Sequence, residues 1–263
     1  MIVHHINCGC MCPWIAKIVP GSIPKTFCCH CLLIEDNDKL ILVDTGISTH
    51  DCDQPKRLGL THKLFNFQLN KHETALHQIR ELGYNPDEVT DIILTHLDSD
   101  HASGLCDFTK ATVHVSKVEM EAARSQKSFH HRIRYRMHYL HDDFHWNLVD
   151  LTQGEQWQTF DRVQAFPQVS NLLLVDLPGH TPGHLGVAVK AEDTWLLHAG
   201  DAYYHHSLVS EKANAYRLLT FFEKRAHMDY AQAQDSLRRI QDLPSDIETV
   251  CSHDASYFPD LEI

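Results

Sequence analysis

Four side chains that can bind a metal ion lie within six residues of the sequence: His96, Asp98, Asp100 and His101. They follow directly after the apolar run 92–94, which is typical of a buried strand. Burying so many polar groups costs several kcal/mol unless something pairs with them, and a divalent cation is the usual partner. The alternative is a polar surface loop, because the chain has 22 His. Residues elsewhere in the sequence distinguish a metal site from a polar surface loop.

Three more segments place the same residue types after apolar runs. His180 follows the run 172–175, Asp201 comes shortly after the run 195–197, and His253 comes after the predicted strand 247–251. Four such strand ends, far apart in sequence, are what a metal site at one edge of a sheet requires. Together they favour a metal site over a surface loop.

The ordered pattern resembles the metallo-β-lactamase-fold superfamily, whose signature is HxHxDH, a His in a PGH turn, a bridging Asp and a final His. Within it the chain is most similar to the N-acyl-homoserine-lactone lactonase branch. The matching motifs are Asp-Thr-Gly at 44–46, Gly-His-Thr-Pro-Gly-His at 179–184, Asp-Ala-Tyr-Tyr at 201–204 and His-Asp at 253–254. The resemblance implies an α/β protein with one domain over residues 1–263. Its fold would be a four-layer αββα sandwich with the metal site at one edge of the two sheets.

The resemblance also implies two metal sites, whose ligands carry over position by position. The first would be held by His96, Asp98 and His180 and the second by Asp100, His101 and His253, with Asp201 bridging the two. We therefore expect two divalent metal ions, with zinc as the first expectation.

Asp98 departs from the family pattern, which has His at this position. A third carboxylate makes a cluster of two divalent ions and one hydroxide formally neutral instead of positive, so it would lower the pKa of bound water less. An oxygen ligand also shifts preference from zinc toward manganese or iron, which stay open as alternatives. A further alternative is that Asp98 does not bind metal and that the first site is weak or empty.

The expected reaction is hydrolysis of an ester-like bond, in the first place a lactone, by a hydroxide shared between two metal ions. By resemblance, Tyr204 would donate a hydrogen bond to the substrate carbonyl or developing oxyanion, and Asp100 would help to protonate the leaving oxygen. A buried, packing role for Tyr204 stays open. Other enzymatic possibilities are a phosphodiesterase and a thioester hydrolase of the glyoxalase II kind. A non-haem iron redox protein and a metal-dependent sensor without turnover are the alternatives from other classes.

Three neighbouring residues are expected to support the site without binding metal. His184 opens the strand after the PGH turn and His198 lies on a buried strand, so both are predicted to be structural. Asp44 is predicted to orient a ligand through a hydrogen bond.

Composition limits the partners. The formal net charge of −12 argues against a nucleic-acid surface, and no apolar stretch is long enough to span a bilayer. We expect a small-molecule substrate, no nucleic-acid or membrane partner, and a monomer or homodimer. The N-terminus lacks the features of a signal peptide and the nine Cys are an odd number, so we expect a cytoplasmic protein with reduced thiols.

The sequence does not decide the roles of two segments. Six Cys fall between residues 8 and 31, and those at 8, 10 and 12 would share one face of a strand. Buried structural thiols are the first interpretation, with an auxiliary metal or redox site as the alternative. The stretch 129–146 is basic, aromatic and His-rich. Arg132, Arg134 and Arg136 are candidates for contacting an acidic substrate group, unless the stretch is a solvated helical face.

Hydrophobic periodicity predicts the elements around these motifs. Residues 31–35 and 40–43 should form a hairpin, and residues 71–82 and 229–243 should form amphipathic helices. The pattern is compatible with the αββα sandwich without singling it out.

Overall fold

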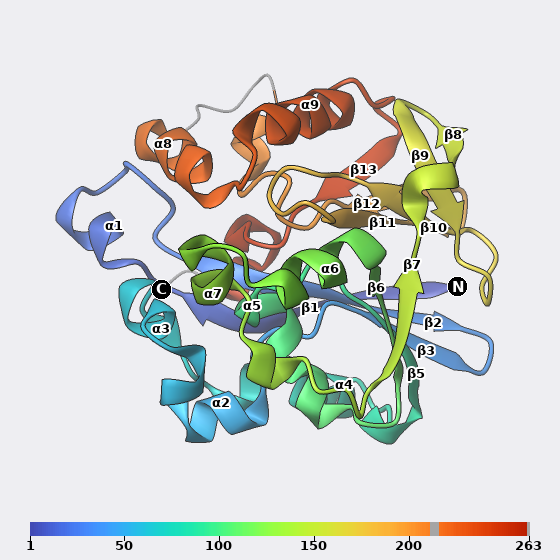
Figure 1. Cartoon of the computed structure of the whole chain (residues 1–263), viewed down its shortest axis with the longest axis horizontal. Helices are drawn as coiled ribbons and strands as arrows, with labels where there is room; N and C mark the ends of the chain where they lie inside the picture. Colours follow the sequence, from blue (N-terminus) through green and yellow to red (C-terminus); the bar gives the residue numbers. More distant parts are fainter. Residues whose placement is uncertain (211–215, 262–263) are drawn as a thin grey trace.

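The structure of the chain, a computed structural model, describes residues 1–210 and 216–261. Residues 211–215 and 262–263 of the predicted domain lie outside the described residues. Two mixed sheets pack against each other, and helices cover both outer faces (Figure 1). The predicted αββα sandwich is therefore confirmed.

Seven strands form the first sheet, in the order β4-β1-β2-β3-β5-β6-β7. Their bounds in chain order are β1 Ile2–Met11, β2 Phe27–Asp36, β3 Lys39–Val43, β4 Phe67–Gln68, β5 Val89–Ile93, β6 Thr112–Ser116 and β7 His145–Val149. The predicted hairpin is confirmed as β2 and β3, which pair antiparallel. From β3 through β7 the neighbouring strands run parallel, so their carboxyl ends meet at one edge of the sheet.

Six strands form the second sheet, in the order β13-β12-β11-β10-β9-β8. Their bounds in chain order are β8 Glu155–Trp157, β9 Phe160–Ala165, β10 Leu172–Asp176, β11 Leu185–Ala191, β12 Thr194–His198 and β13 Ile247–Val250. Only β12 and β13 pair in parallel. Their carboxyl ends therefore also lie side by side.

The core between the sheets is built from alternating aliphatic residues on the facing strands. Ile34 and Ile41 of the first sheet pack in one cluster with Leu174 and Val187 of the second. Since side chains alternate between the two faces of a strand, the residues in between, such as Leu33 and Leu42, join a second cluster beneath the outer helices. Both faces of the first sheet are thus buried, which explains the nearly continuous apolar runs.

Short helices cover the faces and the end of the sandwich that holds the predicted site residues (Figure 1). They are α1 Trp14–Ile18, α2 Thr49–Asp53, α3 Thr61–Leu64, α4 Ala75–Glu81, α5 Ser99–Ala102, α6 Lys117–Ser125, α7 Phe129–Arg134, α8 Arg217–Ala226 and α9 Tyr230–Gln241. No described helix has the length and apolarity to cross a bilayer.

Two sequence expectations need refinement. The helix predicted over residues 71–82 is interrupted at Thr74, whose extended backbone separates a 3₁₀ turn from α4. The predicted alternation of cysteines on β1 is broken by a bulge between Asn7 and Cys10. Cys12 lies beyond the end of that strand. The helix predicted over 229–243 is observed as α9, capped by the side chain of Asp229.

Candidate metal centre

The first sheet delivers the His- and Asp-rich segment to the edge where its parallel strands end. Residues 94–98 continue from β5, and Asp98 is the N-cap residue of α5. The Asp98 side chain does not cap that helix, although Asp commonly does so. Its carboxylate therefore faces the site. Asp100 and His101 lie in the first turn of α5, which places them one helical turn or less from Asp98.

The second sheet delivers the remaining side chains from three strand ends. His180 lies in the turn between β10 and β11, Asp201 follows β12, and His253 follows β13. The last two segments are joined by the Ser252 N–H, which donates to the Gly200 carbonyl at 3.0 Å. In the turn between β10 and β11, Gly179 has a φ of 131°, and a Cβ added to it would lie 2.1 Å from the backbone nitrogen of Ala233. Only glycine fits this close approach to α9.

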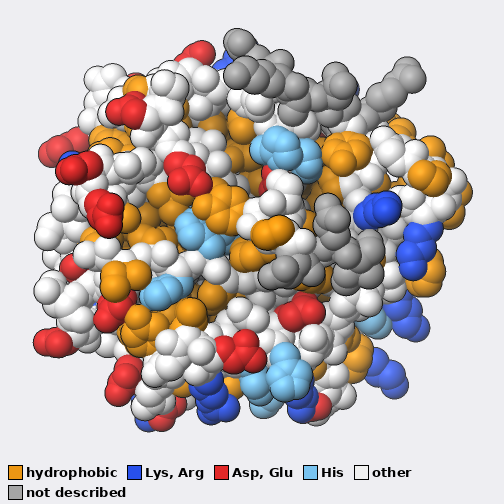
Figure 2. All heavy atoms as spheres, turned by 180° about the vertical axis from the view of Figure 1, so that it is seen from behind, with side chains coloured by type: hydrophobic (Ala, Val, Ile, Leu, Met, Phe, Trp, Pro, Cys, Tyr) orange, Lys and Arg blue, Asp and Glu red, His pale blue; other side chains and the backbone are white. Residues whose placement is uncertain are grey.

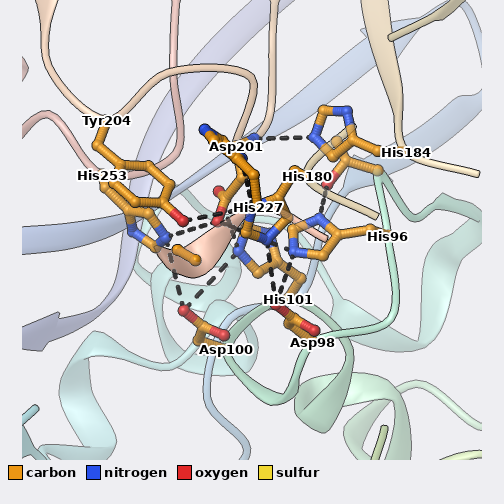
Figure 3. Close-up of polar contacts among 12 residues, drawn as sticks. His96, Asp98, Asp100, His101, His180, His184, Asp201, Tyr204, His227 and His253 are labelled. Atoms are coloured by element: carbon orange, nitrogen blue, oxygen red, sulfur yellow. Dashed lines mark hydrogen bonds and ion pairs between the residues drawn. The ribbon is translucent and has the colours of Figure 1, made fainter. Parts of the chain in front are cut away.

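The predicted ligands converge on one another as two groups (Figure 3). Within each group the potential ligand atoms lie within 4.8 Å of one another; the groups are His96, His180 and Asp201, and Asp100, His101 and His253. These are six of the seven residues predicted from the sequence, divided between two centres as the resemblance implies.

Asp201 lies between the two groups. Its Oδ2 is 3.3 Å from His180 Nε2 and its Oδ1 is 3.3 Å from His101 Nε2. Its Oδ2 also lies 3.1 Å from His253 Nε2. A carboxylate that faces imidazoles of both groups lies where a bridging ligand would be required, and its bridging role stays a prediction.

Hydrogen bonds outside the site fix the orientation of the imidazoles. His101 Nδ1 lies 2.9 Å from Asp44 Oδ2, and His253 Nδ1 lies 2.8 Å from the Cys28 carbonyl. Both partners are acceptors, so each Nδ1 carries the proton and each Nε2 presents a lone pair to the site. The Thr95 hydroxyl donates to Asp44 Oδ2, so it is free to accept from His96 Nδ1 at 3.0 Å.

The donor set fits divalent cations. His96 Nε2, His101 Nε2 and Asp201 Oδ1 are buried and have no hydrogen-bond partner among the described residues. Burial opposes a charge on His101, yet the nearby carboxylates, Asp201 first, hold its pKa well above the usual range. The cluster therefore has an excess of negative charge and of unpaired lone pairs, which a divalent cation bound by imidazole and carboxylate would satisfy.

Asp98 lies beside the first group but is also paired with an arginine. Its Oδ2 is 3.4 Å from His96 Nε2, 3.2 Å from His180 Nε2 and 3.4 Å from Arg134 Nη1. Burial opposes its charge, but Arg134 and then His96 hold the pKa of Asp98 well below its usual range. The structure thus places Asp98 where the resemblance puts a ligand, and its ligation stays a prediction.

Arg134 is the functional residue whose position the sequence did not reveal. Its Nη1 donates to the His180 carbonyl at 3.0 Å and lies 3.1 Å from His180 Nε2, while its Nη2 donates to the Ala226 carbonyl. The stretch 129–146 marked it as a possible substrate contact together with Arg132 and Arg136. Of these three described side chains, Arg134 alone lies within hydrogen-bond distance of a predicted ligand, because it ends α7 next to the PGH turn.

The three supporting residues lie where they were expected. His184 Nε2 accepts the backbone N–H of Asp201 at 2.9 Å, and His198 Nε2 donates to the His30 carbonyl at 2.8 Å. Neither belongs to the two groups of converging atoms. Asp44 binds both Thr95 and His101, so it orients the site from outside.

Tyr204 and His227 flank His180. The Tyr204 hydroxyl lies 3.3 Å from His180 Nδ1, and His227 Nδ1 lies 3.2 Å from the same atom. Burial, with Asp201 next, holds the pKa of Tyr204 well above its usual range, and burial lowers the pKa of His227 to about 4. His227 was not predicted, because an isolated His before α9 has no motif around it.

Glu119 on α6 is a second support that sequence reasoning missed. It is fully buried, and its two oxygens accept the backbone N–H groups of Leu97 and Gly183, each at 3.1 Å. One carboxylate therefore joins the segment after β5 to the PGH turn. Its position within an amphipathic helix gave no signal, because a Glu there is ordinarily solvated.

A pocket of about 390 Å³ opens onto the cluster. Asp98, Asp100, His180, Asp201 and His253 form its polar floor, together with Tyr204 and Arg134. Its walls are apolar and come from four parts of the chain, including Ile23, Phe67, Ile133, Leu219 and Phe222. The site is thus a charged, metal-binding floor beneath an apolar chamber.

The cysteines form no metal site among the described residues, since the groups able to hold an ion contain none of them. All nine are free, and burial raises the pKa of Cys28, Cys29 and Cys31 well above the usual range. This environment favours the interpretation as structural thiols.

Comparison with known proteins identifies the family. Residues 27–253 match the metallo-beta-lactamase superfamily. The chain belongs to the metallo-β-lactamase superfamily. A probable metallo-hydrolase of Mycobacterium tuberculosis is 36% identical over 98% of this chain and 81% of the relative. An N-acyl homoserine lactonase of Bacillus thuringiensis is 26% identical over 62% of this chain and 59% of its own length.

Solved structures show the same fold. An N-acyl homoserine lactone hydrolase with N-hexanoyl-L-homoserine bound at its catalytic metal centre superposes with a TM-score of 0.71. It is 22% identical and the match covers 99% of this chain and 96% of the other. At that identity the likeness establishes the fold alone. Family and site together make the chain a metal-dependent hydrolase of this superfamily.

Proposed function

We propose that this metallo-hydrolase opens a lactone-like ester that carries an apolar chain. The observation that carries the proposal is the pocket, in which apolar walls lead directly to a floor of imidazoles and carboxylates. An ester carbonyl at the floor would meet the charged groups while its chain is buried against the walls. The lactonases among the relatives and neighbouring structures support this choice of ester.

Divalent ions held by the two groups would supply a Lewis acid and lower the pKa of water enough for attack at neutral pH. We propose zinc first, with manganese or iron as alternatives because Asp98 adds an oxygen donor. The nine free cysteines support a cytoplasmic location.

Tyr204 is positioned to donate a hydrogen bond to the substrate. When His180 binds a cation through Nε2, its proton lies on Nδ1, where His227 Nδ1 or the Tyr204 oxygen accepts it. In either case the hydroxyl proton of Tyr204 remains available to the pocket. Because its pKa is raised by burial, the group stays protonated and can stabilise a developing oxyanion.

Asp100 is the candidate for returning a proton to the leaving oxygen. It lines the pocket, and its Oδ2 is 3.6 Å from His253 Nε2. Its side chain is partly exposed, in contrast to the buried Asp201. A carboxylate at the open side of the cluster can reach a leaving group that a buried bridging carboxylate cannot.

The test is a panel of substrates offered to protein loaded with zinc or manganese. The panel pairs N-acyl homoserine lactones of short and long chain with an aryl ester, a glutathione thioester and a phosphodiester. The proposal predicts that kcat/KM is highest for lactones and rises with chain length, because each buried methylene contributes about 0.8 kcal/mol. Faster turnover of the thioester or the phosphodiester would replace the lactone with that substrate class.

A further inference from the structure

The net charge of −12 averages over two unlike surfaces of the molecule. Four segments each contribute to the walls of the pocket: residues 11–26, 54–68, 126–138 and 216–228. Together these segments, here called the rim, contain 12 of the 23 Lys and Arg residues of the chain but only one of its 35 Asp and Glu residues. That one residue, Glu223, is buried. The segments that form the pocket walls are therefore rich in Lys and Arg, and the remainder of the chain is strongly acidic.

The rim also carries the most exposed large hydrophobic side chains of the described chain. Five of them are between 54% and 81% exposed: Trp14, Ile18, Leu60, Leu64 and Phe221. Large apolar side chains gathered on one face of a molecule mark an interaction surface, whereas single ones need no explanation. Figure 2 shows Lys and Arg side chains beside hydrophobic ones along its right-hand margin, while Asp and Glu side chains gather toward the opposite side.

Two basic side chains of the rim lie over aromatic rings, and most of its described basic side chains lack acidic partners. Lys17 Nζ lies 5.1 Å from the centre of the Trp14 ring, and Arg225 Cζ lies 4.9 Å from the centre of the Phe221 ring. Among the described side chains of the rim, only Arg57 and Arg134 form an ion pair with a carboxylate. Exposed Lys and Arg side chains of the rim, including Lys17, Lys63 and Lys224, thus have no carboxylate partner among the described residues.

Contacts between the segments make the rim one continuous surface. The Phe65 and Phe222 rings lie 6.0 Å apart, which joins the segment after α3 to α8. The Leu218 N–H donates to the Ser22 carbonyl at 3.1 Å, which joins α8 to the segment after α1. Helices α1, α3, α7 and α8 accordingly lie at the same end of the molecule in Figure 1.

We propose that the rim binds an anionic lipid surface, such as a bilayer or micelle containing acidic headgroups. Exposed aliphatic and aromatic side chains would enter the boundary between headgroups and acyl chains, while Lys and Arg contact the acidic headgroups. The one acidic side chain of the rim, Glu223, is buried, so the rim lacks the repulsion that the rest of the surface would impose. The expectation of no membrane partner rested on the lack of an apolar stretch long enough to span a bilayer, which does not bear on a contact at the lipid surface.

Two other occupants fit the rim less well. A nucleic acid would use the positive charges, but exposed aliphatic side chains such as Ile18 and Leu60 add nothing to phosphate contacts. A second copy of the chain that used the same face in a twofold dimer would place two strongly positive surfaces against each other. A lipid surface satisfies both the charge and the apolar side chains.

The rim surrounds the pocket mouth, so docking would turn the mouth toward the lipid. An amphiphilic substrate could then pass from the lipid into the apolar chamber. This step rests on the proposed function, whereas the binding of the rim to lipid does not. Binding and turnover are therefore measured separately.

The experiment is co-sedimentation of the full chain, loaded with zinc, with phosphatidylcholine vesicles and with vesicles containing about one third phosphatidylglycerol. We expect binding to the anionic vesicles at least tenfold tighter than to the neutral ones, and weakening as salt is added. Equal affinity for both vesicles, or no binding to either, would overturn the proposal.

Charge variants locate the surface. The rim variant combines Lys17→Gln, Lys63→Gln and Lys224→Gln, and the matched control combines Arg80→Gln, Lys110→Gln and Lys117→Gln, which are exposed elsewhere. Each basic side chain near an anionic surface contributes about fivefold, so the rim variant should bind about 100-fold more weakly and the control as tightly as the parent. Circular dichroism checks that both variants fold.

A second rim variant, Ile18→Ser with Leu64→Ser, tests the apolar contribution without changing charge. It should also lose vesicle binding, whereas a purely electrostatic contact would be unaffected and would contradict the insertion step. Light scattering measures whether the chain forms a dimer, and a titration with a single-stranded oligonucleotide measures nucleic-acid binding. A dimer that the rim variants dissociate, or oligonucleotide binding tighter than vesicle binding, would assign the rim to those partners instead.

Discussion

Replacing Arg134 with Met should strengthen metal binding at the first group of ligands. The guanidinium lies 3.1 Å from His180 Nε2 and 3.4 Å from Asp98 Oδ2, so it occupies the neighbourhood of two atoms that a cation would need. Arg134→Met removes the positive charge and keeps an unbranched apolar stem. Asp98 then lacks its partner, and a bound cation is the group that can replace it.

The magnitude follows from these distances. An ion about 2.1 Å from His180 Nε2 would lie within about 5 Å of Arg134 Nη1. At an effective dielectric constant of about 20, repulsion between charges of one and two at about 5 Å is roughly 6–7 kcal/mol. Solvent that enters the pocket screens this repulsion. If about 1.4–2.8 kcal/mol remains, the affinity rises tenfold to hundredfold.

The assay is calorimetric titration of chelator-stripped protein with zinc and with manganese. Arg132→Met is the matched control, since Arg132 lies on the same helix, is exposed and donates from Nε to the Gln126 carbonyl instead of contacting a predicted ligand. Asp98→Ala should have the opposite effect and lower the bound metal toward one ion per chain. If Arg134→Met binds an ion at the first ligand group no more tightly than the parent does, the prediction is wrong, because the guanidinium then does not oppose that cation. Unchanged occupancy in Asp98→Ala would remove Asp98 from the site.

Three further changes test the surroundings of the cluster. Tyr204→Phe should lower kcat by about tenfold or more with metal content intact, because a donor to the oxyanion is lost; kinetics equal to the parent's would leave Tyr204 with a packing role. Asp44→Asn should weaken metal binding about 10–100-fold in a chelator competition, since it no longer fixes His101, and an unchanged affinity would refute that role. Burial raises the pKa of Glu223 from 4.5 to about 7, so its contribution to stability is complete below pH 4.5 and is lost as pH rises through 7. The free energy of unfolding, measured with urea, should therefore fall between pH 5 and 8, and this fall should be smaller in Glu223→Gln by no more than about 3 kcal/mol. An equal fall in both proteins would show that Glu223 does not cause the pH dependence.

The sequence predicted those parts of the molecule that depend on local pattern. Apolar runs that end in His or Asp marked the strand ends, and parallel strands bring such ends together at one edge. The local pattern thus marked the strand ends, whereas the αββα fold and the grouping of His96, His180 and Asp201 were expected from the family resemblance. The break at Thr74 could not be expected, because hydrophobic spacing continues across it while the backbone does not.

Groups that act across the fold left no local signal. Glu119 reaches the PGH turn only because α6 packs beside it, and Arg134 reaches His180 only because α7 ends there. The rim is an intermediate case. The scarcity of acidic residues in its four segments is visible in the sequence, but their assembly around one pocket depends on the fold.

Asp98 and Arg134 are best understood as one unit. Exchanging a neutral His for Asp98 adds a negative charge to a buried cluster, and the guanidinium 3.4 Å away cancels it. Four imidazoles, three carboxylates and one guanidinium carry the same formal charge as the five imidazoles and two carboxylates of the HxHxDH pattern. The reduced activation of water expected from Asp98 alone is therefore offset. The two arrangements differ in where the positive charge lies, because here it belongs to the Arg134 side chain at the pocket floor. There it competes with a cation at the first ligand group and can also contact an anionic group of the substrate. This arrangement favours metal occupancy of the second group first, so the first and second ions should differ in affinity.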